Sequence, residues 1–198
     1  MTDGREGELP PGQRLSDLRV KHYGRVPAGE PETWTTVFGV DRGLDDGSAD
    51  ELGRLTAGEL ATWPQTEVVA DLHCASGWTA RDLTWQGVPT AAVLQRFPPP
   101  AGTVGVMAYA QYGYSANVRL ADLLQPTTLL ATGLNGKPLP REHGFPLRLV
   151  VPHLYAHKSP KWFRGWEYLV RPRRGFWEQR GYHLVGDPWA EERYSYME

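Results

Sequence analysis

Cys74 is the only cysteine among the 198 residues of the chain, so we consider it first as a candidate for chemistry. It follows residues 68–72, an apolar, β-branched run typical of a strand, and it precedes a Gly- and Trp-containing segment that we expect to be a loop. A lone cysteine excludes an internal disulfide and any zinc or iron–sulfur site that needs several cysteines. Taken alone, the thiol is better explained as a small apolar residue of the core.

Two pairs of residues that include histidine could also support chemistry, but the evidence for each is weak. His73 adjoins Cys74, but neighbours on a strand point to opposite faces, so adjacency is poor evidence for a nucleophile and its base. His153 and His157 have the spacing of two zinc ligands on one helix face, but Pro152 immediately before them makes a helix doubtful. We therefore expect no zinc pair, and a thiol enzyme using Cys74 with His73 stays an alternative.

A stronger candidate is the segment that carries HGFPLRLVVP and KSPKW. Its glycines and prolines allow the backbone to approach a ligand closely, and Arg148, Ser159 and Lys161 offer donors to an anion at strand ends. A phosphorylated, hydrogen-bonding cofactor would explain these donors. The structural alternative is that Arg148 and Lys161 simply pair with Glu142 or Glu167.

The composition of the chain limits which ligands and partner molecules we expect it to bind. The net charge is −2, with acidic residues gathered toward the N-terminus and basic ones between residues 141 and 174, which suits a defined anionic ligand better than a nucleic acid. The standard nucleotide-binding and serine-hydrolase motifs are absent. No apolar run approaches the roughly 20 residues of a membrane span, and no secretory signal is visible. We expect a cytoplasmic protein without a membrane span or a nucleic-acid partner.

The elements that must position these residues are short. Thr56 and Glu59 have capping-box spacing, which predicts a helix start, and the acidic residues 41–53 are expected to form a loop. We expect a flexible leader over residues 1–17 and one α+β domain over 18–198, with mixed sheets, short helices and long loops. Strands are predicted at 33–40, 68–72, 103–110, 147–152 and 161–170, helices at 90–97 and 118–124, and a turn at 135–140.

The order and spacing of these motifs resemble the molybdopterin-dependent oxidoreductase domain of the sulfite oxidase family over roughly residues 18–194. The chain is especially similar to short bacterial stand-alone sulfite oxidase-like oxidoreductases, and also to bacterial methionine-sulfoxide reductase catalytic subunits. The resemblance implies a sulfite-oxidase-like molybdopterin-binding fold and a molybdenum–molybdopterin cofactor.

The resemblance also implies roles for individual residues. Cys74 would be the metal ligand and a catalytic residue, in keeping with the affinity of a soft thiolate for such a metal, and Tyr114 would be a second catalytic residue. Tyr112 and Ser115 belong to the same segment near the metal. The cofactor-binding residues implied are Lys21, His22, Tyr23, Cys74, His143, Arg148, Lys158, Ser159 and Lys161.

The implied reaction is two-electron oxygen-atom transfer on a small S-oxide, N-oxide or sulfite-like substrate, with a separate electron-transfer partner. Trp78 and Thr79 stand where sulfite oxidases have arginines, and Gly77 stands where the short homologues usually have one. We therefore expect less positive charge near the metal and a neutral substrate. Trp177, Tyr182 and Trp189 are interpreted as packing residues. The alternative is a non-catalytic cofactor-binding or structural module of the same fold.

Overall fold

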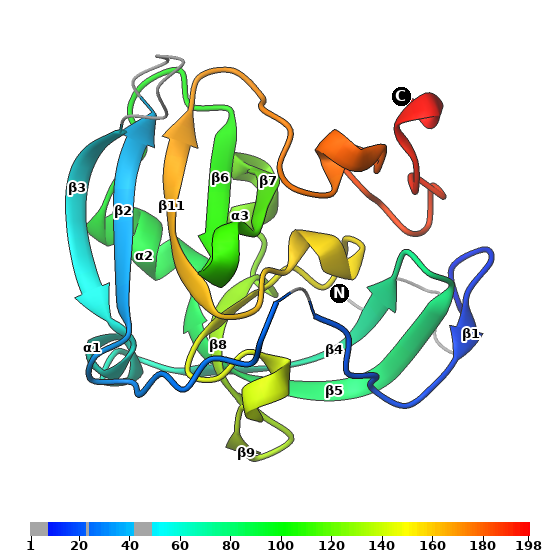
Figure 1. Ribbon diagram of the computed structural model, residues 1–198, viewed down its shortest axis with the longest axis horizontal. Helices are drawn as coiled ribbons and strands as arrows, with labels where there is room; N and C mark the ends of the chain where they lie inside the picture. Colours follow the sequence, from blue (N-terminus) through cyan, green and yellow to red (C-terminus); the bar gives the residue numbers. More distant parts are fainter. Residues whose placement is uncertain (1–7, 23, 42–48) are drawn as a thin grey trace.

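Two β-sheets with short helices make up the chain, which the computed structural model describes over residues 8–22, 24–41 and 49–198 (Figure 1). The predicted mixed α+β fold is confirmed. Among the described residues no helix is long and apolar enough to cross a membrane.

The first sheet has the strand order β3-β2-β11-β6-β7. β11 runs parallel to β2 and antiparallel to β6, and its side chains pack with those of β2 in the larger core, where Phe38 and Trp166 are buried. The strands of this sheet are β2 (Thr35–Asp41), β3 (Ala49–Thr56), β6 (Gly105–Ala110), β7 (Ser115–Arg119) and β11 (Phe163–Leu169).

The second sheet has the order β1-β5-β8-β10, with β4 paired to β5 and β9 to β8. β4 and β5 form a long antiparallel hairpin in which Cys74 pairs with Trp78 at the tip. A smaller core, which includes Trp85 and Leu129, packs on this sheet. Its strands are β1 (Arg14–Leu15), β4 (Thr66–Cys74), β5 (Trp78–Pro89), β8 (Leu129–Leu134), β9 (Lys137–Pro138) and β10 (Arg148–Val150).

The helices are short, as predicted. Thr56 and Glu59 form the expected capping box at the start of α1 (Ala57–Ala61), where each side chain bonds the other's backbone N–H and so satisfies two N–H groups that the helix leaves unpaired. The predicted helix at 90–97 is α2 (Thr90–Arg96), and the helix predicted from 118 begins two residues later as α3 (Leu120–Leu123) because Val118 and Arg119 belong to β7. Single 3₁₀ turns include η2 (Arg141–His143), η3 (Ala156–Lys158) and η4 (Glu178–Arg180).

Three expectations were wrong or incomplete. The segment after Cys74, expected to be a loop, is the 12-residue strand β5. The last part of the acidic segment is β3 rather than loop; residues 42–48 lie outside the described part. β8 was not predicted at all. These strands are specified by pairing with distant strands, and local composition reports such pairing poorly.

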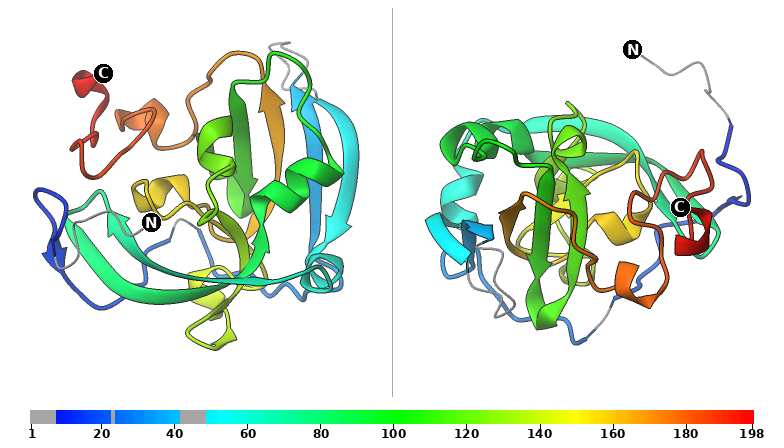
Figure 2. Two further views of the ribbon diagram at one scale, coloured as in Figure 1. Left: turned by 180° about the vertical axis from the view of Figure 1, so that it is seen from behind. Right: turned by 90° about the horizontal axis from the view of Figure 1, so that it is seen from above.

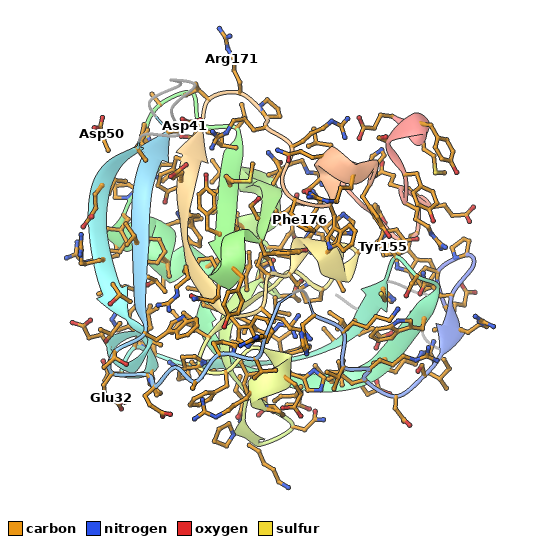
Figure 3. The ribbon with its side chains drawn as sticks, viewed as in Figure 1. Glu32, Asp41, Asp50, Tyr155, Arg171 and Phe176 are labelled. Atoms are coloured by element: carbon orange, nitrogen blue, oxygen red, sulfur yellow. The ribbon has the colours of Figure 1, made fainter. Side chains whose placement is uncertain are left out.

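The C-terminal segment, residues 175–198, lies across from the tip of the β4–β5 hairpin, with η3 between them (Figure 1; Figure 2, left). Tyr155 and Phe176 lie where this segment approaches η3, whereas Arg171 projects away from the molecule (Figure 3). Within the predicted leader, Arg14–Leu15 forms β1 and pairs in parallel with the start of β5. The hairpin tip is therefore flanked by β1 and by the C-terminal segment.

Candidate active site

A cavity of about 720 Å³ lies where the hairpin tip, residues 18–22, η3 and the C-terminal segment converge. Its volume falls in the usual range for sites that enclose a cofactor or a drug-sized ligand. The described residues that line it include basic side chains and aromatic rings but no Asp or Glu. The sequence-predicted site residues that it brings together are Lys21, His22, Cys74, Tyr114, His143, Arg148, Ser159 and Lys161.

Cys74 is the last residue of β4, directly before the turn that joins β4 to β5. Its carbonyl oxygen accepts hydrogen bonds from the Gly77 N–H at 2.9 Å and from the Gln13 side chain at 3.2 Å, so its backbone is held on two sides. The thiol is partly exposed and lines the cavity. His73, its neighbour, is buried with Nδ1 2.9 Å from the Thr79 hydroxyl, and it does not line the cavity. The structure thus gives the thiol no histidine base at this position.

A short hydrogen-bond chain reaches the thiol. Lys21 Nζ donates to Ser76 Oγ at 3.1 Å, and Ser76 Oγ lies 3.2 Å from Cys74 Sγ. A thiolate has no proton to donate, so the Ser76 hydroxyl must be the donor whenever Cys74 is ionised. The chain then runs in one direction, from the ammonium through the hydroxyl to the sulfur.

Arg148 is buried at the start of β10. Its guanidinium donates to the backbone oxygens of His143 at 3.0 Å and Ser159 at 3.2 Å, and it lies over the Trp85 ring, 5.0 Å from the centroid. Burial lowers the pKa of Arg148 to about 10, which leaves it charged at neutral pH. Glu167, one of its two expected partners, is bound by Tyr109 and Arg173 instead, and no ion pair of Arg148 with a carboxylate is found among the described residues.

Lys161 is a second cation that lines the cavity. Its ammonium donates to the backbone oxygens of Lys21 at 2.7 Å and Glu142 at 2.8 Å, and burial lowers its pKa to about 7. Burial, followed by the charges of Lys161 and Arg148, lowers the pKa of His143 to about 4. The predicted structural alternative, pairing of Arg148 and Lys161 with glutamate side chains, is therefore not observed. An anion entering here would meet a buried guanidinium, a half-buried ammonium and a neutral imidazole.

Two predicted residues stand apart from this group. Lys158 does not line the cavity; its ammonium is buried against Glu178 at 2.5 Å, with neither side chain exposed. Tyr23 lies outside the described residues. Of the residues named near the metal, Tyr112 is exposed on the surface, whereas Tyr114 lines the cavity and donates to the His157 carbonyl oxygen at 2.6 Å.

His157 was missed as a cavity residue. Its ring is buried and lines the cavity, and neither ring nitrogen has a hydrogen-bond partner in the described part of the chain. The His153 ring bonds Asp122 at 3.0 Å instead, so the two histidines form no metal pair. The sequence signal was only the density of polar and aromatic residues before KSPKW, which says nothing about where a ring points.

Gly77 has a different role from the one expected. It closes the hairpin turn at φ +87, and a Cβ added there would lie 3.3 Å from the Gly12 carbonyl oxygen; the residue does not line the cavity. Arg19 and Lys21 line the cavity from the N-terminal segment, so positive charge reaches it from a segment other than the one after Cys74. Arg19 lies 5.8 Å from the centroid of the Trp78 ring.

Several polar atoms at the cavity wall are buried and unpaired. They are Trp78 Nε1, His143 Nδ1, Arg148 Nε and both ring nitrogens of His157. Each buried, unsatisfied group costs about 1–3 kcal/mol, so such a set indicates a ligand that supplies the missing partners. The site complements a ligand with an anionic end and several hydrogen-bonding groups.

Similarity to known proteins points to the same kind of ligand. Residues 23–177 match the family described as the oxidoreductase molybdopterin binding domain. The chain is 38% identical over 193 residues to the uncharacterized oxidoreductase YuiH of Bacillus subtilis, with 96% of this chain and 93% of that protein covered.

It is 36% identical over 144 residues to the protein-methionine-sulfoxide reductase catalytic subunit MsrP of Xanthomonas axonopodis, covering 65% of this chain and 42% of that protein. The chain thus spans less than half the length of this relative. Among solved structures, the sulfane dehydrogenase SoxCD of Paracoccus pantotrophus matches with a TM-score of 0.65 at 19% identity, over 76% of this chain and 42% of that chain. That likeness shows a shared fold.

Proposed function

Because this chain belongs to the family of the oxidoreductase molybdopterin-binding domain and is a molybdopterin-dependent oxidoreductase, we propose that it performs two-electron oxygen-atom transfer with Cys74 as the protein ligand to a molybdenum–molybdopterin cofactor. The substrate class is a small S-oxide, N-oxide or sulfite-like molecule. The observation that carries the proposal is the presentation of the only thiol into a cavity that also holds Arg148 and Lys161 and that, among the described residues lining it, has no carboxylate.

The residues present fit this cofactor. Arg148 and Lys161 are the cations suited to its phosphate end, and Ser159 lines the cavity beside them. The unpaired His143 Nδ1 and Trp78 Nε1 suit the hydrogen-bonding edges of a pterin. Among the described residues, no group of three or more His, Cys, Asp and Glu could hold a metal ion, and a metal held mainly by its own organic ligand needs only the one thiolate that Cys74 provides.

When bound, the cofactor supplies the two-electron chemistry, and the protein supplies binding, orientation and electrostatics. Reduction of an oxide takes two electrons and two protons and releases water; oxidation of sulfite runs in the opposite sense. Burial raises the pKa of Tyr114 well above its ordinary value, and its proton is already donated to the His157 carbonyl oxygen. We therefore assign Tyr114 to orienting the cavity wall that borders the reaction rather than to proton transfer.

The names of relatives support two further parts of the proposal. Several are protein-methionine-sulfoxide reductase catalytic subunits, which favours an oxide as substrate. A catalytic subunit works with another component, which favours a separate electron-transfer partner for this chain as well.

Elemental analysis of protein purified from a host that makes the cofactor tests the proposal. We expect about one molybdenum and one phosphorus per chain in the wild type and loss of molybdenum in Cys74→Ser, because the variant removes the soft ligand. Circular dichroism of the variant checks that it folds. Metal-free wild-type protein would refute the proposal and favour the structural module. Thiol-dependent activity in metal-free protein would instead favour the thiol enzyme.

A further inference from the structure

The C-terminal segment forms one wall of the cavity. Trp177 and Tyr182 line it from this segment, whereas the match to the family ends at residue 177. Tyr182 therefore completes the cavity from a part of the chain outside the region that defines the family. What this wall does is not given by family membership.

The wall is held in place by buried contacts. Glu178 accepts from Lys158 Nζ at 2.5 Å and from the Asn117 N–H at 3.0 Å, and Lys158 Nζ also donates to the Leu184 carbonyl oxygen at 2.5 Å. These bonds bracket Tyr182 on both sides along the chain. Charge-assisted hydrogen bonds in a buried setting fix the geometry of the groups that they join.

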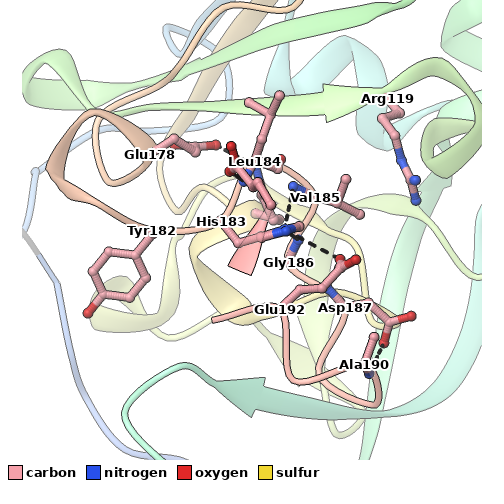
Figure 4. Close-up of polar contacts among 12 residues, drawn as sticks. Arg119, Glu178, Tyr182, His183, Leu184, Val185, Gly186, Asp187, Ala190 and Glu192 are labelled. Atoms are coloured by element: carbon pink, nitrogen blue, oxygen red, sulfur yellow. Dashed lines mark hydrogen bonds and ion pairs between the residues drawn. The ribbon is translucent and has the colours of Figure 1, made fainter. Parts of the chain in front are cut away.

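The next turn packs directly on the ring of His157. His183 Nδ1 accepts from the N–H groups of Val185 and Gly186 at 3.1 Å each (Figure 4), and the Gly186 carbonyl oxygen accepts from the Tyr155 N–H at 2.8 Å. A Cβ on Gly186 would lie 3.2 Å from His157 Cε1. The absence of a side chain at Gly186 lets the segment approach this close.

The resulting surface is a recess of aromatic rings. The ring centroid of Tyr182 lies 5.3 Å from that of His157 and 5.3 Å from that of Trp177, distances typical of interacting rings. Neither ring nitrogen of His157 is paired, and no hydrogen bond from the Tyr182 hydroxyl is made within the described residues. The recess thus offers polar atoms together with apolar ring faces.

The polar groups of the recess are uncharged. Burial, followed by the charge of Lys158, lowers the pKa of His157 to about 3. Burial and then the charges of Tyr194 and Cys74 raise the pKa of Tyr182, against the smaller lowering effect of Arg193, and Tyr182 lines the same cavity as Cys74. The cavity's cations lie on other segments: Arg19 and Lys21 before the hairpin, Arg148 on β10 and Lys161 after η3.

We propose that this recess of His157, Trp177 and Tyr182 is the substrate-selecting wall of the cavity, and that it favours an uncharged oxide with apolar substituents over an oxoanion. The inference rests on the proposed function and names the substrate class of that site. The rings contact the apolar substituents, and the Tyr182 hydroxyl donates to the oxide oxygen. An oxoanion placed against the recess would lose water without gaining a cation there.

Redox-inert probes test the proposal by equilibrium binding, without turnover. Methyl phenyl sulfone represents the uncharged class and sulfate the oxoanions, and both are titrated into molybdenum-replete protein by calorimetry. We expect the wild type to bind the sulfone about tenfold more tightly than sulfate. Tyr182→Ala and Trp177→Ala should weaken sulfone binding by about tenfold and leave sulfate binding unchanged, since each removes one ring of the recess.

Two variants complete the design. Tyr182→Phe keeps the ring and should weaken sulfone binding by about threefold or more through loss of the donor. Tyr196→Ala removes a tyrosine of the same segment that is 81% exposed, and it should change nothing. Molybdenum content and thermal unfolding are measured on every variant.

Three outcomes would overturn the proposal while leaving the proposed function intact: tighter binding of sulfate than of sulfone by the wild type, unchanged sulfone affinity in molybdenum-replete Tyr182→Ala, or unchanged affinity in Tyr182→Phe. Wild-type protein without molybdenum would overturn the proposed function itself. Tyr182→Phe conserves packing, so it remains informative if the alanine variants unfold.

Discussion

The ammonium of Lys158 lies 2.5 Å from the carboxylate of Glu178, and neither side chain is exposed. The pair joins η3 to the C-terminal segment that carries Trp177 and Tyr182. Lys158 and Lys161 stand three residues apart in KSPKW, yet the first anchors the wall of the cavity and the second lines the cavity.

Removing one partner of this pair should destabilise the protein strongly. We expect Lys158→Ala to lower the free energy of unfolding by about 3–5 kcal/mol, because it leaves a buried carboxylate unpaired. The double variant Lys158→Met with Glu178→Gln removes both charges and keeps an acceptor for the Asn117 N–H, so it should recover most of the loss. Urea unfolding measures both. Loss of cofactor from a stable double variant would contradict the anchoring role and favour a cofactor contact for Lys158.

Gly77 should tolerate no side chain without cost. Gly77→Ala and Gly77→Arg both place a Cβ at φ +87 near the Gly12 carbonyl oxygen, and each should lower the free energy of unfolding by about 1–2 kcal/mol. Gly102→Ala is the matched control, since Gly102 has φ +83 with nothing near its Cβ position. The additional loss of stability in Gly77→Ala over Gly102→Ala measures the cost of the close approach to the Gly12 carbonyl oxygen. Thermal unfolding gives the comparison. A stable Gly77→Arg variant with tighter sulfate binding would show that this position does reach the cavity.

Ser76 should tune the sulfur of Cys74 without holding the cofactor. In Ser76→Ala the hydroxyl donor at 3.2 Å from the sulfur is lost, so the thiolate lone pairs are less stabilised. We expect the sulfur-to-metal absorption band of loaded protein to move to longer wavelength while the molybdenum content stays unchanged. Lys21→Met removes the ammonium that donates to the Ser76 hydroxyl, so it should give a smaller shift of the band in the same direction. An unmoved band in Ser76→Ala would mean that the hydroxyl does not bond the ligated sulfur.

Lys161 should make the stability of cofactor-free protein rise with pH. Its folded-state pKa of about 7 lies below the ordinary lysine value of 10.5, so between these values the unfolded chain binds a proton that the folded chain does not. Unfolding therefore becomes less favourable as pH rises across this window. Urea midpoints at pH 7, 8 and 9 should climb in the wild type and climb less in Lys161→Met. Loading the cofactor should also reduce the rise of the urea midpoint with pH, because a phosphate beside Lys161 keeps the ammonium charged. Equal slopes of midpoint against pH in the cofactor-free wild type and in Lys161→Met would contradict the prediction.

Much of the fold and the family followed from local sequence signals. The capping box of Thr56 and Glu59 needs only four consecutive residues, and the strand over Phe163–Leu169 shows in its aromatic content. The motifs around Arg148 and Lys161 marked these residues as candidates for anion binding, because the spacing of a motif is set by the chain itself and not by its distant neighbours.

Tertiary structure decided which side chains share the cavity. Cys74, Lys21 and Tyr182 meet there from segments more than 50 residues apart, and Lys158 turns away from it toward Glu178. Whether a lysine meets a ligand or a buried carboxylate, and whether a histidine ring faces a cavity, depends on contacts with remote segments. The sequence alone determined the chemical groups available, and only packing determined which of them face one another, because burial and electrostatics act through space rather than along the chain.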